Sequence, residues 1–334
     1  MSNVKVAGIG AYLPSLVVTN DDISELVETN DAWILERTGI KERRISEGEE
    51  TSEIAIKASK IALERAGIKG EDLDLIIVAT VSPDMFIPSV ACLVQSKLDA
   101  DNAACFDINV ACSGFVYGLE IAKGMMQSMN YENALVIGSE TLSKVVDWND
   151  RGTCILFGDG SGAAVLKKSD EVGIIKSYLR SNGKKSEALT IGATDFNTPF
   201  SREANLKDRI IKMNGREVFK FATTAIVDGV KKIIEDTNIS LEEIKYIVPH
   251  QANDRIIDSA ARRLNLDKEK FYVNVDRVGN TSSASVPIAL NEMYEKDLIE
   301  KGDKLILVAF GGGLTYGATL LEWWYGIWIL NPIN

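Results

Sequence analysis

Apolar and polar positions alternate along the chain with two different periods, which predicts a layered α/β fold. Unbroken apolar runs such as residues 75–80 have the length of buried strands. Segments in which apolar side chains recur every three or four positions, such as residues 52–66, have the pattern of amphipathic helices. No basic-then-apolar leader opens the chain, and we expect a first strand within residues 1–6.

The two halves of the chain repeat one order of predicted elements. The first half has a helix, two strands, a helix and a strand at residues 52–66, 75–80, 104–110, 114–126 and 134–138. The second half has the same series at residues 218–236, 245–248, 271–275, 282–294 and 304–309. Each half closes with a glycine-bearing stretch and one more strand. We therefore predict two copies of one unit, residues 1–170 and 171–334, paired about a pseudo-twofold axis.

Three chemically capable side chains occupy related places in this repeat. Cys112 and Asn280 lie in equivalent strand-to-helix turns, and His250 follows a strand of the second half. A twofold relation would bring the two turns toward each other at the interface between the copies, where ligand sites tend to form. We therefore expect Cys112, His250 and Asn280 to meet in one pocket.

Each candidate also has a purely structural interpretation. A helix N-terminus would lower the thiol pKa of Cys112, but a buried structural cysteine is the alternative. His250 could be a satisfied core residue, and Asn280 a turn or cap residue. The glycines 311–313 could form a tight turn, or expose a backbone N–H to a ligand oxygen.

Composition narrows the functional classes. The 334 residues carry a formal net charge of −11, which argues against general affinity for nucleic acid or anionic membranes. One histidine, and four cysteines without metal-ligand spacing, argue against a metal site. Apolar runs fall short of a membrane span and a chain this long needs no disulfides, so we expect a protein of the reducing cytoplasm.

Several motifs in a fixed order make the chain similar to a known family. They are Thr38-Gly39-Ile40, Arg43-Arg44-Ile45, Ala111-Cys112-Ser113-Gly114-Phe115, Phe157-Gly158-Asp159-Gly160, His250-Gln251-Ala252-Asn253, Gly279-Asn280-Thr281-Ser282 and Phe310-Gly311-Gly312-Gly313. Together they resemble the thiolase-fold condensing enzymes, and closely the β-ketoacyl-acyl carrier protein synthase III family. The resemblance implies an αβαβα thiolase fold built from two duplicated halves.

The resemblance also implies an activity. The Cys112 thiolate would accept an acyl group from an acyl-coenzyme A primer, with the backbone N–H groups of Cys112 and Gly312 forming the oxyanion hole. His250 and Asn280 would stabilise the enolate that forms when malonyl-acyl carrier protein loses carbon dioxide. The carbanion would attack the acyl-cysteine and so initiate type II fatty-acid synthesis. No permanently bound cofactor and no metal is implied.

Further contacts follow from the same resemblance. Trp33 and Arg151 would hold the coenzyme A adenine, Arg37 would lie near the phosphates, and Arg216 near the pantetheine tunnel, where some members carry Asn. The resemblance places the acyl pocket at Ile87 and Phe310, and the carrier-protein docking surface at Lys220, Arg255, Arg262 and Arg263. The alternative for these basic residues is a solvated helix face.

Some members carry Phe at the position of Ile87, in a region that the family builds partly from the partner of a homodimer. An aliphatic residue there leads us to expect primers longer or more branched than acetyl. A second functional hypothesis is a related condensing enzyme of a secondary-metabolite pathway, and a third is a Cys-His-Asn hydrolase. The tail from Trp324 through Leu330 runs past the usual family end, and it could pack on the domain, contact a partner or be a cloning remnant.

Overall fold

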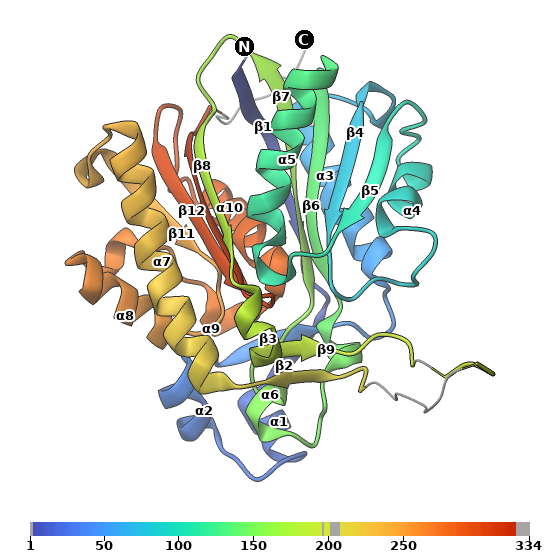
Figure 1. Ribbon diagram of the computed structural model, residues 1–334, viewed down its shortest axis with the longest axis vertical. Helices are drawn as coiled ribbons and strands as arrows, with labels where there is room; N and C mark the ends of the chain where they lie inside the picture. Colours follow the sequence, from blue (N-terminus) through green and yellow to red (C-terminus); the bar gives the residue numbers. More distant parts are fainter. Residues whose placement is uncertain (1–2, 196, 201–207, 325–334) are drawn as a thin grey trace, which may run out of the picture.

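The computed structural model describes residues 3–195, 197–200 and 208–324 and contains two main β-sheets with corresponding arrangements of strands (Figure 1). The first sheet has the spatial order β1 (Asn3–Tyr12), β7 (Gly160–Ser169), β6 (Asn133–Glu140), β4 (Leu75–Ala79) and β5 (Ala104–Ile108). The second has the order β8 (Ile174–Ser181), β13 (Thr315–Glu322), β12 (Lys304–Gly311) and β11 (Ile244–Pro249). In both sheets the first-named pairs are antiparallel and the last are parallel, so the duplication predicted from the sequence is confirmed.

Helices separate and cover the two sheets. Between the sheets lie α5 (Gly114–Met129) and α10 (Ser285–Glu295), whose apolar side chains share one core with strands of both sheets. Outside the first sheet lie α3 (Thr51–Ala66) and α4 (Val90–Lys97), and outside the second lie α7 (Gly215–Thr237) and α8 (Asp254–Leu264). The layer order is therefore αβαβα, which confirms the expected thiolase fold.

One predicted strand does not form. The segment 271–275 runs beside β11 in the second sheet. It holds the position that β5 holds beside β4 in the first sheet. It makes a single bridge, between Phe271 and Ile247. The chain then turns at once into the short helix α9 (Val275–Val278). The apolar run was long enough for a strand, but the turn into α9 ends it after one bridge.

The side chain of Gln251 takes the place of the missing strand ladder. Its Oε1 accepts hydrogen bonds from the backbone N–H groups of Asn274 and Val275, at 3.0 and 3.2 Å. Its Nε2 donates to the carbonyl oxygen of Tyr272 at 3.0 Å. Gln251 is fully buried, so these bonds satisfy backbone groups that have no access to water.

Small elements cover one end of both sheets (lower part of Figure 1). They are β2 (Leu16–Thr19), β3 (Glu42–Ile45), β9 (Leu189–Ile191), β10 (Ile211–Met213), α1 (Asn20–Ser24), α2 (Asp31–Thr38) and α6 (Arg151–Cys154). The buried side chain of Arg43 joins them, because it donates to the carbonyls of Val18 and Ile155 and to Asn20. Burial lowers the pKa of Arg43 to about 10.

Two short 3₁₀ turns start the central helices and repeat each other residue by residue. Ala111–Ser113 precedes α5, and Ser282–Ala284 precedes α10. The first residue of each turn has a positive φ, 45° at Ala111 and 48° at Ser282. Aligned in this way, Cys112 corresponds to Ser283, and Asn280 corresponds to Asn109. The equivalent-turn prediction was therefore correct for the turns, although Cys112 and Asn280 are not counterparts of each other.

Other short 3₁₀ turns lie at Gly70–Asp72, Leu142–Val145, Gly183–Ala188, Leu241–Glu243 and Lys268–Lys270. Among the described residues, no helix is both long and apolar enough to cross a membrane. In the same part of the chain, no three histidine, cysteine or acidic side chains gather as metal ligands would.

Candidate active site

Cys112 lies where two cavities meet. A larger cavity of about 540 Å³ is lined by Cys112, Ser282 and Gly312 together with residues of the covering elements. A narrower one of about 130 Å³ is lined by Cys112, His250 and Asn280. The structure therefore brings the three predicted side chains into one pocket, and a second pocket continues beyond the thiol.

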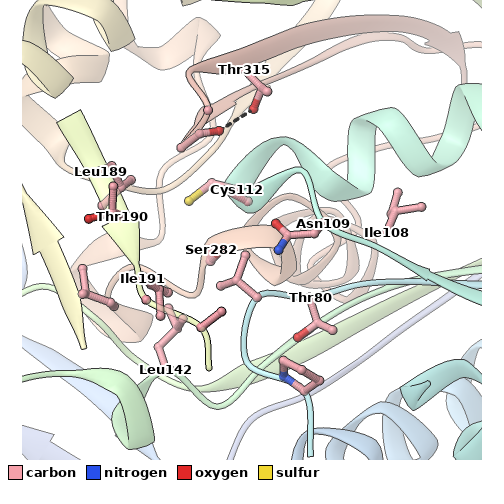
Figure 2. A pocket seen from close by; sticks show the side chains of 18 of the residues that line it. Thr80, Ile108, Asn109, Cys112, Leu142, Leu189, Thr190, Ile191, Ser282 and Thr315 are labelled. Carbon is pink, nitrogen blue, oxygen red and sulfur yellow. Dashed lines mark hydrogen bonds between the residues drawn. The ribbon is translucent and has the colours of Figure 1, made fainter. Parts of the chain in front are cut away.

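The larger cavity is mostly apolar. Figure 2 shows the sulfur of Cys112 directed toward the space between Leu189 and Ser282. The apolar part of the wall includes Val81, Ile108, Leu142, Phe157, Leu189, Ile191 and Ile211. Such a wall suits a hydrocarbon chain, because burying apolar surface is favourable by about 25 cal/mol per Å². The cavity lies where an acyl group attached to Cys112 would extend.

His250 is held in the narrower cavity by three contacts. Its backbone N–H donates to the carbonyl of Val308 at 2.8 Å, which continues the pairing of β11 with β12. Its Nδ1 lies 2.6 Å from the Oγ of Ser285, and its ring packs edge-on against Phe310 at a centroid distance of 5.0 Å. Burial lowers the pKa of His250 to about 3, so the imidazole is neutral at physiological pH.

Asn280 presents its amide nitrogen to the same cavity. The backbone N–H of Ser282 donates to Asn280 Oδ1 at 2.9 Å, which assigns the oxygen to the turn and leaves the NH₂ group for the pocket. Its backbone is also fixed, since its N–H donates to the carbonyl of Leu156 and its carbonyl accepts from Gly158. His250 and Asn280 are thus two neutral side chains, and each can offer an N–H to one ligand oxygen.

The expected lowering of the Cys112 pKa is not found. The pKa of the thiol is raised to about 12, chiefly by burial; a hydrogen bond with Ser282 opposes this rise, and the nearby charge of Glu140 adds to it. The turn at the start of α5 does not compensate for the loss of hydration. The thiol is therefore protonated before substrate binds, and acyl transfer has to displace its proton.

Glu140 is fully buried, and its carboxylate contacts the turn Ser282–Ala284. Thr80, Val81 and Ser82 donate to one carboxylate oxygen, and Ser282 and Ser283 donate to the other. Burial raises the pKa of Glu140, and these donors oppose that shift. The cluster joins the loop after β4 in the first half to the turn before α10 in the second half.

The glycines at the end of β12 allow two backbones to approach. A Cβ at Gly311 would lie 2.7 Å from the backbone nitrogen of Cys112, closer than real atoms pack. A Cβ at Gly312 would lie 3.4 Å from the Cβ of Ala111. Gly312 lines the larger cavity beside Cys112, which fits the backbone pair expected for an oxyanion hole.

Two residues expected in the acyl pocket do not line the larger cavity of the single chain. Ile87 is 87% exposed and does not line the larger cavity, whereas Pro83 and Phe86 of the same loop do. Phe310 lines the narrower cavity and packs on His250 instead of facing the larger one. The side chains of successive strand residues point to opposite faces, and at the end of β12 this alternation directs Phe310 toward His250.

The residues expected to hold coenzyme A lie on the surface around the pocket. Trp33 lies between Arg37 and Arg151, whose guanidinium carbons are 4.4 and 4.6 Å from its ring. Arg151 thus stacks directly on the indole, and an adenine between them would require this stack to open. Arg216 is exposed at the start of α7, next to Gly215, which lines the narrower cavity.

The four residues expected to dock the carrier protein lie exposed on two helices that pack together. Lys220 on α7 and Arg255, Arg262 and Arg263 on α8 are all exposed. The two helices pack against each other through a common apolar core, and Arg263 donates to Thr224 of α7 at 3.3 Å. The narrower cavity opens between these helices and the covering elements, as its lining by Val218 and Ile256 indicates.

Sequence reasoning missed Glu140, Ser285 and the walls supplied by β9 and β10. An isolated glutamate at a strand end carries no motif, and β9 and β10 fall in the connection between α/β units. A residue-by-residue alignment of the two turns would have drawn attention to Ser283 and Ser285, since they correspond to Cys112 and Gly114.

Comparison with known proteins gives one consistent result. Residues 106–183 match the family model described as 3-oxoacyl-[acyl-carrier-protein] synthase III, and residues 234–323 match its C-terminal counterpart. The beta-ketoacyl-[acyl-carrier-protein] synthase III of Clostridium beijerinckii is 72% identical over 97% of this chain and 100% of its own. The enzyme of the same name from Clostridium acetobutylicum is 52% identical over 97% and 99%.

Solved structures agree. The 3-oxoacyl-[acyl-carrier-protein] synthase III of Aquifex aeolicus VF5 superposes with a TM-score of 0.90 at 44% identity, covering 96% of this chain and 100% of that one. The priming beta-ketosynthase of the R1128 polyketide pathway has a TM-score of 0.89 at 32% identity, covering 97% of both chains. The chain therefore belongs to the β-ketoacyl-[acyl-carrier-protein] synthase III family of acyltransferases.

Proposed function

We propose that the protein condenses an acyl group carried on Cys112 with malonyl-acyl carrier protein, the initiating step of type II fatty-acid synthesis. The observation that carries this proposal is the place of Cys112 at the junction of an apolar cavity and a channel lined by His250 and Asn280. A secondary-metabolite pathway is the alternative. It is not favoured, because relatives at 52–72% identity bear the synthase III name, while the polyketide ketosynthase is 32% identical.

Acyl transfer is the first half of the reaction. The Cys112 sulfur attacks the thioester carbonyl of the primer, the C–S bond to coenzyme A breaks, and the thiol proton of Cys112 ends on the departing coenzyme A sulfur. The N–H groups of Cys112 and Gly312 stabilise the oxyanion, an effect of about 3 kcal/mol for one donor. The acyl chain then extends into the larger cavity.

Condensation follows in the narrower cavity. The thioester oxygen of malonyl-acyl carrier protein accepts hydrogen bonds from His250 and Asn280, which stabilise the enolate formed when carbon dioxide leaves. The carbanion attacks the acyl carbon, the bond to Cys112 breaks, the released Cys112 thiolate takes up a proton from solvent, and the β-ketoacyl product stays on the carrier protein. Both donors are neutral, so they stabilise the developing negative charge without binding the product as an ion pair.

We further propose that acyl-coenzyme A enters past Trp33, Arg37 and Arg151, with Arg216 at the channel mouth. No permanently bound cofactor or metal is required. Lys220, Arg255, Arg262 and Arg263 would receive the acidic carrier protein, which a chain of net charge −11 needs a local basic surface to attract.

A homodimer is part of this proposal. Met85, Phe86 and Ile87 are 48%, 72% and 87% exposed in the single chain, an unusual place for three consecutive apolar side chains. Phe86 lines the larger cavity, and Ile87 of one protomer would reach the acyl pocket of its partner. All four cysteines are free thiols, which supports the reducing cytoplasm as the compartment.

One experiment tests the activity. The protein is incubated with acetyl-, butyryl- or isobutyryl-coenzyme A, the mass of the Cys112 peptide is measured, and malonyl-acyl carrier protein is then added. We expect a stable acyl adduct from all three primers, followed by the matching β-ketoacyl product. Absence of an adduct, or its hydrolysis without condensation, contradicts the proposal, and labelling by acetyl-coenzyme A alone contradicts the broad primer range. Cys112→Ala is the control.

A further inference from the structure

The ring of His250 has one hydrogen-bonding partner among residues 3–195, 197–200 and 208–324, the hydroxyl of Ser285. The two atoms, Nδ1 and Oγ, are 2.6 Å apart, and both residues are buried, at 1% and 0% exposure. His250 also lines the cavity that it shares with Cys112 and Asn280, whereas Ser285 does not, so Nε2 is the ring nitrogen left for that cavity. If the hydrogen between Ser285 and His250 belongs to Nδ1, Nε2 of the neutral ring is an acceptor. If it belongs to the Ser285 hydroxyl, Nε2 carries the ring proton and is a donor.

A hydroxyl can take either role in such a contact, unlike a carboxylate, which only accepts from the ring. If Nδ1 carried the proton, Ser285 would accept it, and the hydroxyl hydrogen of Ser285 would need another acceptor. Within the described part of the chain, Ser285 Oγ makes no second hydrogen bond. A buried donor without an acceptor costs about 1–3 kcal/mol, so this arrangement is disfavoured.

The reverse arrangement satisfies every group. Ser285 donates its hydroxyl hydrogen to an unprotonated Nδ1, and the single ring proton lies on Nε2. The imidazole is neutral in this buried place, so it carries one ring proton and not two. Nε2–H then points into the cavity as a hydrogen-bond donor.

We propose that Ser285 is a positioning residue that holds His250 in the Nε2–H tautomer by donating to Nδ1. It starts α10, at the position equivalent to Gly114 at the start of α5, so the second half has a hydroxyl where the first half has only a hydrogen atom. The catalytic consequence rests on the proposed function. With Nε2 protonated, His250 serves the enolate-forming half of the reaction and does not accept the Cys112 proton in the acyl-transfer half.

The tautomer can be measured without any activity, because His250 is the only histidine in the chain. Protein labelled with ¹⁵N-histidine gives one pair of ring nitrogen signals, and two-bond ¹H–¹⁵N correlations identify which nitrogen carries the proton. We expect the wild-type protein at pH 7 to show Nε2 protonated and Nδ1 unprotonated. A protonated Nδ1 in the wild type overturns the proposal, whatever the enzyme does.

Variants then separate positioning from stability. In Ser285→Ala we expect a second tautomer to appear, and decarboxylation of malonyl-acyl carrier protein to slow about threefold to tenfold, the equivalent of one lost hydrogen bond. Acylation of Cys112 by acetyl-coenzyme A should change less than twofold. Ser285→Thr keeps the hydroxyl and should restore the wild-type tautomer if it folds.

Ser59→Ala is the matched control, because Ser59 is also fully buried and its hydroxyl donates to the carbonyl of Ala55 within α3. It should lower the melting temperature without changing the ring signals or the ratio of the two half-reactions. Equal loss of both half-reactions in Ser285→Ala, with an unchanged tautomer, would reduce Ser285 to a structural residue. Failure of both half-reactions in the wild type, with the expected tautomer present, would count against the proposed function and not against the role of Ser285.

Discussion

The carboxylate of Glu140 lies close enough to Cys112 for its charge to raise the pKa of the thiol, and the hydroxyl of Ser282 reaches both residues. A buried negative charge makes it harder for a neighbouring thiol to lose its proton, which works against the proposed role of Cys112 as nucleophile. The same carboxylate binds five donors from both halves of the chain. Glu140 therefore fixes the geometry of the site at the expense of thiol reactivity.

Glu140→Gln separates these two effects. Removing the charge should lower the Cys112 pKa, and alkylation by iodoacetamide at pH 8 should become roughly threefold to tenfold faster. The amide cannot accept from all five donors, so the free energy of unfolding should fall by about 1–3 kcal/mol. Ser283→Ala removes one donor and keeps the charge, and it should destabilise the protein without faster alkylation. Slower alkylation in Glu140→Gln would contradict the assigned effect of the charge.

The wild-type thiol gives a second prediction. Because burial raises the Cys112 pKa to about 12, the thiolate fraction should rise about tenfold per pH unit between about pH 7 and 9. Iodoacetamide labelling of the Cys112 peptide, followed by mass spectrometry, should show this slope. A plateau below pH 9 would mean that the turn before α5 stabilises the thiolate more than burial opposes it.

His250 should give decarboxylation a flat pH profile. Its pKa is lowered to about 3 from 6.5, so the imidazole stays neutral from about pH 5.5 to 8 and no histidine titration should appear. The measurement is the rate of carbon dioxide release from malonyl-acyl carrier protein. His250→Ala should slow it on the order of a hundredfold while Cys112 still becomes acylated. A rate that falls with a midpoint near pH 6.5 would show that the ring is hydrated in the working enzyme.

Gly311→Ala tests the contact between the two backbones. The added methyl group would lie 2.7 Å from the Cys112 nitrogen, so the turn has to shift and acylation should fall by at least tenfold. Gly124→Ala is the matched control, because Gly124 lies exposed in α5 and a Cβ there would meet nothing within 4 Å. It should keep full activity and stabilise the protein by up to about 1 kcal/mol. Equal acylation rates in the two variants would show that the close approach of Gly311 to Cys112 does not matter for acylation.

Gln251→Ala tests the side chain that replaces a strand ladder. It would leave the backbone groups of Asn274, Val275 and Tyr272 unpaired in the interior, and should cost about 2–4 kcal/mol in urea unfolding. Gln251→Glu keeps the acceptor and should be intermediate at neutral pH. A loss below about 0.5 kcal/mol would show that another group satisfies these backbone atoms.

Periodicity was sufficient to predict the layered fold and the duplication, because each half buries its strands and helices in the same order. It failed at residues 271–275, where an apolar run long enough for a strand is interrupted by hydrogen bonds from one side chain, Gln251. Short-range patterns do not contain that tertiary contact. The helix predicted at residues 218–236 is also longer in the structure, where α7 runs from Gly215 to Thr237 between the cap residues Asn214 and Asn238.

The site was predictable in its membership and not in its environment. Cys112, His250 and Asn280 stand in motifs, so their meeting could be expected from the repeat and the family resemblance. The raised Cys112 pKa depends on burial and on Glu140, which is distant in sequence and has no motif. The exposure of Ile87 and the packing of Phe310 on His250 depend on the exact path of a loop and a strand end.

The correspondence of Cys112 with Ser283 has a consequence for how the two halves divide their work. One turn carries the thiol that we propose as the nucleophile, while its counterpart carries a hydroxyl that donates to Glu140. The pseudo-twofold axis thus relates the turn that carries the proposed nucleophile to a turn of similar backbone conformation that only makes hydrogen bonds. Each half is incomplete alone, since the reactive turn of the first depends on an anchor that the second supplies.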